Sequence, residues 1–354
     1  MPTDAVKALP VPDLAGVRIL RLAFGTASCL WVSQAVAWDL AYIAPIVTIV
    51  VLALPLPAPK FKAGVGLIAA LSVSLLAGLA LLPRMVHQPA VGVLLLALAL
   101  YWTFYFTARG GPAVIGALLT MGLAIATAVG TVSVDAVLAV AQGVVIGAAA
   151  GVAFVWIAHA AIPDSLAAPA ATPGTPDKPA APDPANARWH AFRSLVVVLP
   201  VALWFIASSA SASYVPVMIK VASMGQQASR DATRVAARSL ILSTLIGGAG
   251  AVVGWHVLRI APTLPVYVLF VALAGLMAGP RIFRGAGMRA DGDTWSYAYL
   301  TMMVILAPAV MDSAGGAVAG AKFVDRMLMF GWATLYAVVA VNVFDAFRPR
   351  MARR

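Results

Sequence analysis

The sequence predicts an all-α membrane protein with about twelve transmembrane helices, arranged as two six-helix parallel repeats. Hydrophobic residues make up 62% of the 354-residue chain and charged residues only 10%. The mean hydropathy is strongly positive. Apolar runs follow one another along the chain, most of them near the ~20 residues that a helix needs to cross ~30 Å of hydrocarbon. This composition excludes a soluble protein.

The apolar runs form two groups separated by one polar segment. The first group lies at about residues 19–38, 40–57, 63–82, 90–107, 112–132 and 136–160, and the second at about 193–210, 214–228, 239–258, 263–280, 295–311 and 327–346. The segment between them is rich in Pro and Ala, which predicts an exposed cytoplasmic linker. The expected organisation is a first repeat over 1–162, a linker over 163–187 and a second repeat over 188–354.

Matching landmarks in the two groups indicate an internal repeat. A proline lies in the second run of each half, Pro45 and Pro216. The next basic turn follows at a nearly equal interval, at Arg109 and at Arg281. Because each half has an even number of predicted spans, the two units are expected to be parallel.

The distribution of Lys and Arg predicts which side of the membrane each connection faces. Placing both termini and the even-numbered connections on one side gathers most of the basic residues there, and the opposite side keeps only Arg84, Arg259, Lys322 and Arg326. Cytoplasmic loops carry such an excess, so both termini are expected in the cytoplasm. Topology thus explains the net charge of +11, and we expect the lipid bilayer rather than nucleic acid as the partner.

The eighth run and the polar sequence after it form the candidate substrate site. Lys220 stands four residues after Pro216, where the first half has Ile49. One interpretation is that Lys220 faces a water-filled cavity and attracts an anionic group, while Pro216 loosens the helix. The alternative is that the ammonium snorkels outward or pairs with an outer-side aspartate. The predicted substrate-binding or transport residues are Tyr214, Pro216, Lys220, Gln226, Gln227, Arg230, Arg234 and Arg238.

The arginines of this stretch have helical spacing. Arg230, Arg234 and Arg238 follow one another at intervals of four, so they share one face of a helix that leads into the ninth run. That face could gather anionic substrate at the cytoplasmic mouth. Alternatively, it anchors the helix among lipid phosphates, and Gln226 and Gln227 are then interfacial residues.

Proton coupling needs a titratable group in the pathway, and four aspartates are candidates. They lie near the predicted outer ends of spans: Asp39, Asp135, Asp312 and Asp325. A loop residue or a helix cap is the alternative role for each. Asp312 is the strongest candidate because it follows a run that contains Pro308.

Other chemistry finds no support in the sequence. The single cysteine, Cys29, permits neither an internal disulfide nor a cysteine-based metal site. Motifs for phosphate binding, zinc proteolysis and serine hydrolysis are absent. We therefore expect no enzyme activity, no cofactor and no metal. Small residues at every fourth position, such as Gly143, Gly147 and Gly151, predict close helix packing.

Several of these features together resemble a known family. They are Arg18-x-x-Arg21 before a Gly-containing run, a Tyr/Ala-Pro second run and a basic step, and the sequence TRVAARSLILSTLIGGAGAVVG. This pattern resembles the fusaric-acid-resistance-like membrane proteins, the aromatic acid exporter group. The family's usual Leu-Gly-Thr is missing, with Ser243-Thr244 nearby, and the large cytoplasmic domains are absent. The chain thus looks like a compact, membrane-only branch.

The resemblance implies an efflux transporter of the bacterial inner membrane. Its expected substrates are aromatic carboxylic acids or similar organic anions and hydrophobic compounds, and its expected drive is the proton gradient. Its expected partners are a periplasmic adaptor of the HlyD type and an outer-membrane channel. The sequence leaves open another two-half transporter of the major facilitator type, a non-transporting scaffold subunit, and a homo-oligomer.

Overall fold

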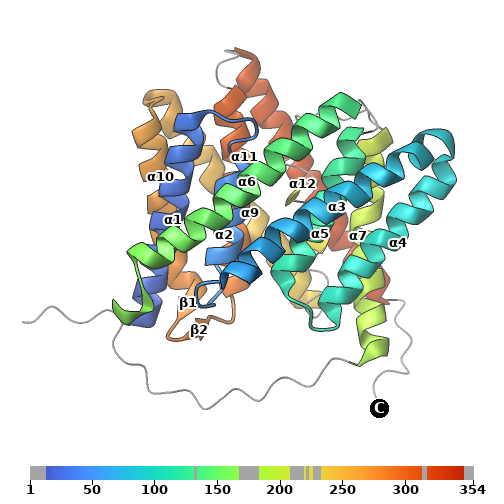
Figure 1. Ribbon diagram of the computed structural model, residues 1–354, viewed down its shortest axis with the longest axis horizontal. Coiled ribbons are helices and arrows are strands. Elements are labelled where there is room, and N and C mark those ends of the chain that lie inside the picture. Colours follow the sequence, from blue (N-terminus) through green and yellow to red (C-terminus); the bar gives the residue numbers. More distant parts are fainter. Residues whose placement is uncertain are drawn as a thin grey trace, which may run out of the picture.

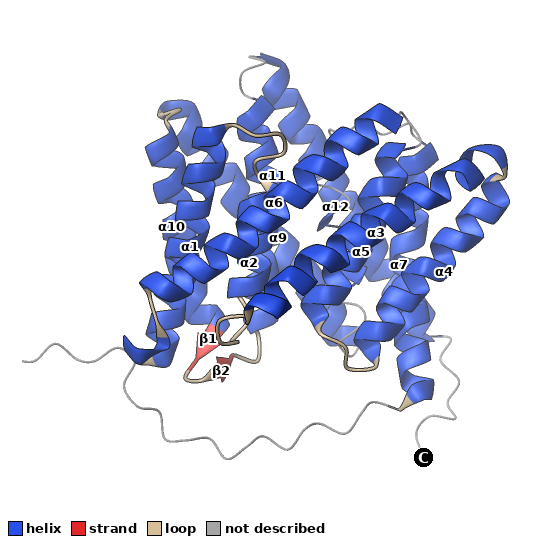
Figure 2. Cartoon of the chain, viewed as in Figure 1, coloured by secondary structure: helices blue, strands red, loops and turns tan. Residues whose placement is uncertain are grey.

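The chain folds into a bundle of α-helices with one small β-hairpin (Figures 1 and 2). The computed structural model describes residues 13–130, 134–166, 183–207, 219–220, 223–225, 233–312 and 317–346. Within these ranges, nine helices are long and apolar enough to cross a membrane. The chain is therefore an all-α, multi-pass membrane protein.

The elements follow the predicted order. In the first half they are α1 (Leu14–Val36), α2 (Ile43–Leu52), α3 (Phe61–His87), α4 (Pro89–Ala108), α5 (Ala113–Gly130) and α6 (Val134–Ala161). In the second half they are η1 (Asp164–Leu166), α7 (Pro184–Ala207), α9 (Thr233–Ile260), α10 (Leu264–Ile282), β1 (Phe283–Arg284), β2 (Gly287–Met288), α11 (Gly292–Asp312) and α12 (Ala317–Ala346). Only short helical pieces of the predicted eighth span, at 219–220 and 223–225, lie within the described ranges.

Helix α2 is shorter than the run from 40 to 57 predicted. It begins at Ile43 and ends at Leu52, and it is buried along almost its whole length. Pro55 follows three residues later and disfavours a helical conformation for the residue before it, and Pro57 and Pro59 come after it. The apolar stretch therefore continues past the helix without extending it.

The helix contacts cross between the two halves. Helix α1 packs against α10, and α4 packs against α7, while α3 packs against α5 and α9 against α11. If α1 is matched to α7, then α4 matches α10, and the α1–α10 contact corresponds to the α4–α7 contact. In the same way, the α3–α5 contact corresponds to the α9–α11 contact. The first helix of each half therefore lies beside a helix of the other half, so the halves interlock instead of forming separate bodies.

Two buried arginines fasten the elements at one end of the bundle. Arg18 of α1 donates to the backbone oxygen of Ala286 in the hairpin at 2.6 Å. Arg21 donates to the backbone oxygen of Ile162 and forms an ion pair with Asp164. The start of α1, the end of α6 and the β-hairpin consequently meet at the same end of the molecule (Figure 1).

Small residues allow α6 to approach α2. A methyl group added at Gly147 would lie 2.8 Å from Cβ of Ile43, and one added at Gly151 would lie 2.6 Å from the backbone oxygen of Ala44. Separations below 3 Å are not tolerated, so only glycine fits at these positions. The spacing of small residues in this run thus reports close packing.

Gly151→Ala should lower the thermal unfolding midpoint, because the new methyl group presses on backbone that cannot move aside. Overpacking of this kind costs about 1–3 kcal/mol. Gly331→Ala is the matched control, since Gly331 is exposed on α12 and an added methyl group meets no atom within 4 Å. The control should keep or slightly raise the midpoint, because Ala favours helix over Gly by about 1 kcal/mol. Equal midpoints for the two variants, measured on purified protein in detergent, would contradict the packing.

Candidate functional site

The structure describes only part of the predicted substrate site. Lys220 is described in full. Arg238 is exposed near the start of α9, and Arg234 belongs to the same helix, although its side chain lies outside the described part. The remaining predicted residues lie outside the described ranges: Tyr214, Pro216, Gln226, Gln227 and Arg230.

Lys220 is buried and bonded to one helix of the second half. Only 2% of the residue is exposed. Its Nζ donates a hydrogen bond to Oγ1 of Thr301 at 2.7 Å, and that hydroxyl donates in turn to the backbone oxygen of Tyr297 at 2.6 Å. The hydroxyl's single proton is thereby used, which leaves its lone pairs to accept from the ammonium.

The ammonium lies near the middle of the membrane-spanning helix α11. Thr301 stands between Gly292 and Asp312, at the two ends of that helix. With a rise of about 1.5 Å per residue, it lies roughly 14 Å from one end and 16 Å from the other. Because the side chain is buried at this depth, Lys220 does not snorkel to either surface in this structure.

The charge of Lys220 has no carboxylate partner among the described residues. The ion pairs among the described residues are formed by Arg21, Arg289, Lys322 and Arg326. Asp312, one of the four predicted coupling aspartates, is held by Lys322 at 3.2 Å and by Arg326 at 2.6 Å. An ammonium inside a bilayer is costly and is usually retained for function.

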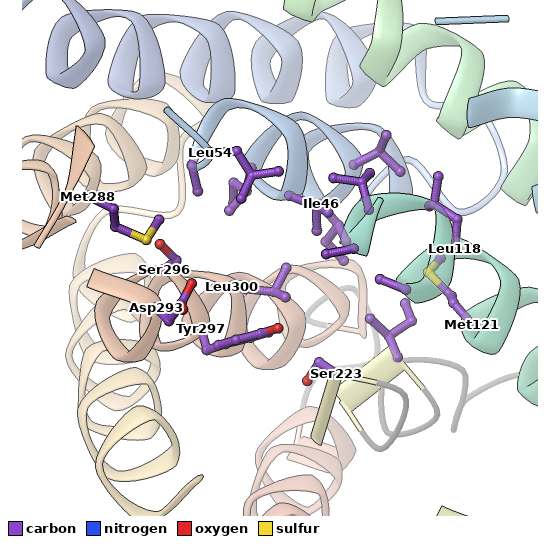
Figure 3. Close-up of a pocket in the computed structure, with 18 residues that line it drawn as sticks. Ile46, Leu54, Leu118, Met121, Ser223, Met288, Asp293, Ser296, Tyr297 and Leu300 are labelled. Atoms are coloured by element: carbon purple, nitrogen blue, oxygen red, sulfur yellow. The ribbon is translucent and has the colours of Figure 1, made fainter. Parts of the chain in front are cut away.

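A cavity of about 80 Å³ is lined in part by α11, the helix that carries Thr301. Helices α2 and α5 of the first half form one wall. Helix α11 and strand β2, together with Ile219 and Ser223, form the other, so the cavity lies between the two halves (Figure 3). Lys220 and Thr301 are not among its lining residues, but their chain neighbours Ile219 and Leu300 are. The two bonded residues are thus each one position along the chain from a residue that lines the cavity.

The cavity is mostly apolar, with a few polar groups on one side. Its aliphatic lining includes Ile46 and Leu118, whereas Ser223, Asp293 and Tyr297 supply oxygen atoms (Figure 3). An apolar lining with a few polar groups is usual for a small-molecule site, but such sites have volumes of about 300–1,000 Å³, so this cavity would have to widen to hold an organic acid. It is large enough to admit several water molecules, since one needs only about 10–15 Å³.

Sequence reasoning missed the α11 residues of this site. Asp293, Tyr297 and Thr301 follow one another at intervals of four, so they share one face of α11. That spacing was a usable signal. It stood out less than Lys220 because a threonine inside an apolar helix commonly bonds its own preceding turn, as Thr301 also does.

The four predicted coupling aspartates do not line this cavity. Asp39, Asp135 and Asp325 are exposed. Asp312 instead connects the end of α11 to α12 through its two ion pairs, an arrangement that favours a structural role. Among the described residues, no group of His, Cys and Asp could hold a metal ion, and Cys29 is buried as a free thiol.

Thr301→Val should destabilise the protein by about 1–3 kcal/mol, because the buried ammonium loses its hydrogen-bond acceptor. Thr127→Val is the matched control, since Thr127 is equally buried but bonds only within its own helix. Adding Lys220→Met to Thr301→Val should recover stability, since both partners are then apolar. Thermal unfolding of the purified variants measures all three, and a Thr301→Val protein as stable as the control would argue against the bond.

Comparison with known proteins gives one match. A family described as "Protein of unknown function (DUF2955)" matches residues 18–159, which correspond to the first predicted six-span unit. No curated protein and no solved structure matches the chain. The first half is thus similar to a family of uncharacterised proteins, and its many apolar helices fit an integral membrane protein.

Proposed function

We propose that this membrane protein is a transporter that exports aromatic carboxylic acids or similar organic anions. The observation that carries the proposal is the Lys220 ammonium, which lies buried at mid-depth, bonded to Thr301 and without a carboxylate among the described residues. A cation held there is available to neutralise an anion that enters from the adjoining cavity.

The cavity suits the remainder of such a substrate. Its aliphatic walls would take the apolar ring or chain of an organic acid, and its position between the two halves matches where transporters built from repeats bind substrate. The hydroxyl groups of Ser223 and Tyr297 could orient polar substituents. A rocking motion of the interlocked halves would widen the cavity and turn Lys220 towards it.

The chamber also distinguishes the candidate functions. A scaffold subunit has no need of an unfilled space between its halves, and a lone buried cation would only weaken it. The cavity and Lys220 together thus support transport over assembly.

Direction, drive and partners complete the proposal. The resemblance to aromatic acid exporters supports outward transport from the bacterial inner membrane, driven by protons, together with a periplasmic HlyD-type adaptor and an outer-membrane channel. Asp293 lines the cavity and carries a titratable carboxyl group, so it is a further candidate for proton coupling besides Asp39, Asp135, Asp312 and Asp325.

Lys220→Gln should reduce export of an aromatic acid about tenfold or more, because a hydrogen bond to a charged group is worth about 1.5–3 kcal/mol. Efflux of radiolabelled 2-naphthoate from preloaded cells measures the effect at equal expression. Lys62→Gln is the matched control, since Lys62 is exposed at the start of α3, and it should export like the unmodified protein.

Two outcomes would count against transport through this site. Equal export by the Lys220→Gln and Lys62→Gln proteins would show that the buried ammonium does not bind the anion. A protein that exports no organic acid in its unmodified form, while its deletion disrupts a membrane complex, would indicate a scaffold.

A further inference from the structure

A second pocket lies near the ends of the helices opposite the β-hairpin. It has a volume of about 330 Å³ and lies between the last turns of α1 and α9, the start of α10 and the end of α11. Gln34 lines it from α1, sixteen residues beyond Arg18, which contacts the hairpin. In the predicted orientation, this pocket opens at the outer side of the membrane.

The polar residues that line this pocket offer mainly donors. The buried Nε2 of Gln34 and the hydroxyl of Tyr267 have no hydrogen-bond partner in the described part of the chain, and Tyr267 is only 2% exposed. Arg259 adds a guanidinium from the last turn of α9. Buried polar groups normally find partners. Both atoms are covered in this structure, so a rotation of each side chain would bring its donor to an acceptor in the pocket.

Apart from the polar Thr263, the remaining lining is apolar. Trp255 stacks on Phe323 with their ring centres 5.1 Å apart and their planes 8° from parallel. Leu258, Leu264 and Val310 add aliphatic surface, and no carboxylate occurs among the lining residues. A ligand in this pocket would therefore meet a fixed aromatic wall and hydrogen-bond donors, but no negative side chain.

We propose that this pocket binds the carboxylate of a small aromatic or aliphatic acid, with Arg259 as its cation and Gln34 and Tyr267 as neutral donors. Arginine recognises a carboxylate with two parallel hydrogen bonds, and 330 Å³ is within the range of small-molecule pockets. The inference adds an outer site to the proposed transport path. It depends on the proposed function only for the choice of acid as a probe.

The first half supplies a matched control for Arg259. Arg84 is likewise an exposed arginine near the end of a long helix on the outer side, but its guanidinium donates to Oε1 of Gln88 at 3.1 Å. Its local partner leaves it less available to a ligand. Substituting either arginine removes one positive charge from the same side of the protein, so any difference between the variants reports the pocket.

Binding of 2-naphthoate to the full-length protein in phosphatidylcholine nanodiscs tests the proposal. The measurement uses isothermal titration calorimetry with Lys220→Gln as the background, which removes the central ammonium. In that background, Arg259→Gln should weaken binding about tenfold, because an ionic hydrogen bond is lost, while Arg84→Gln leaves it unchanged. Tyr267→Phe should weaken binding by a smaller factor, and the neutral 2-naphthylmethanol should bind less tightly than the acid.

The alternative outcomes are distinct from failure of the transport proposal. Equal affinities of the Arg259→Gln and Arg84→Gln proteins would overturn the outer site, as would complete loss of binding in the Lys220→Gln background alone. Displacement of naphthoate by phosphatidylglycerol in the nanodisc would overturn it too, because the pocket would then hold a lipid headgroup. These results come from binding measurements alone, so they do not depend on whether Lys220 variants export the acid.

Discussion

The hydrogen bond between Lys220 and Thr301 is the constraint on which the site depends. It joins residues 81 positions apart, and it holds an ammonium where hydrocarbon would otherwise surround it. Burying a charge without an ionic partner is unfavourable. The one hydroxyl that bonds the ammonium within the described part of the chain offsets only part of that cost, which leaves a centre that an incoming anion would stabilise.

The interlocked packing explains why this centre lies between the halves. Because α1 packs on α10 and α4 on α7, the two halves cannot separate along a simple plane. Their inner elements face one another across the cavity, with α2 and α5 on one side and α11, Ile219 and Ser223 on the other. The cavity walls thus come from both halves while the buried cation belongs to the second, and a relative movement of the halves would alter the cavity.

Hydropathy and charge predicted the membrane class and most helix positions, and the rarity of lysine within apolar runs singled out Lys220. The early end of α2 could have been predicted from Pro55, Pro57 and Pro59. The length of the apolar run suggested a longer helix instead. The partner of Lys220 could not be predicted, because the spacing of residues along the chain does not indicate a contact between positions 81 residues apart. The packing of α1 on α10 and of α4 on α7 could not be predicted either, because the hydrophobic pattern of a helix does not show which other helix its apolar face contacts.

The most direct test of the central claim is the nuclear magnetic resonance signal of Lys220 in protein labelled with ¹³C at lysine Cε. The chain has six lysines, so the Lys220→Gln variant assigns the signal by its absence. Saturating 2-naphthoate should shift this signal, because its carboxylate would bind the ammonium, whereas the uncharged 2-naphthylmethanol should leave it nearly unchanged. Naphthoate that binds at the central cavity while the Lys220 signal stays fixed would contradict the account.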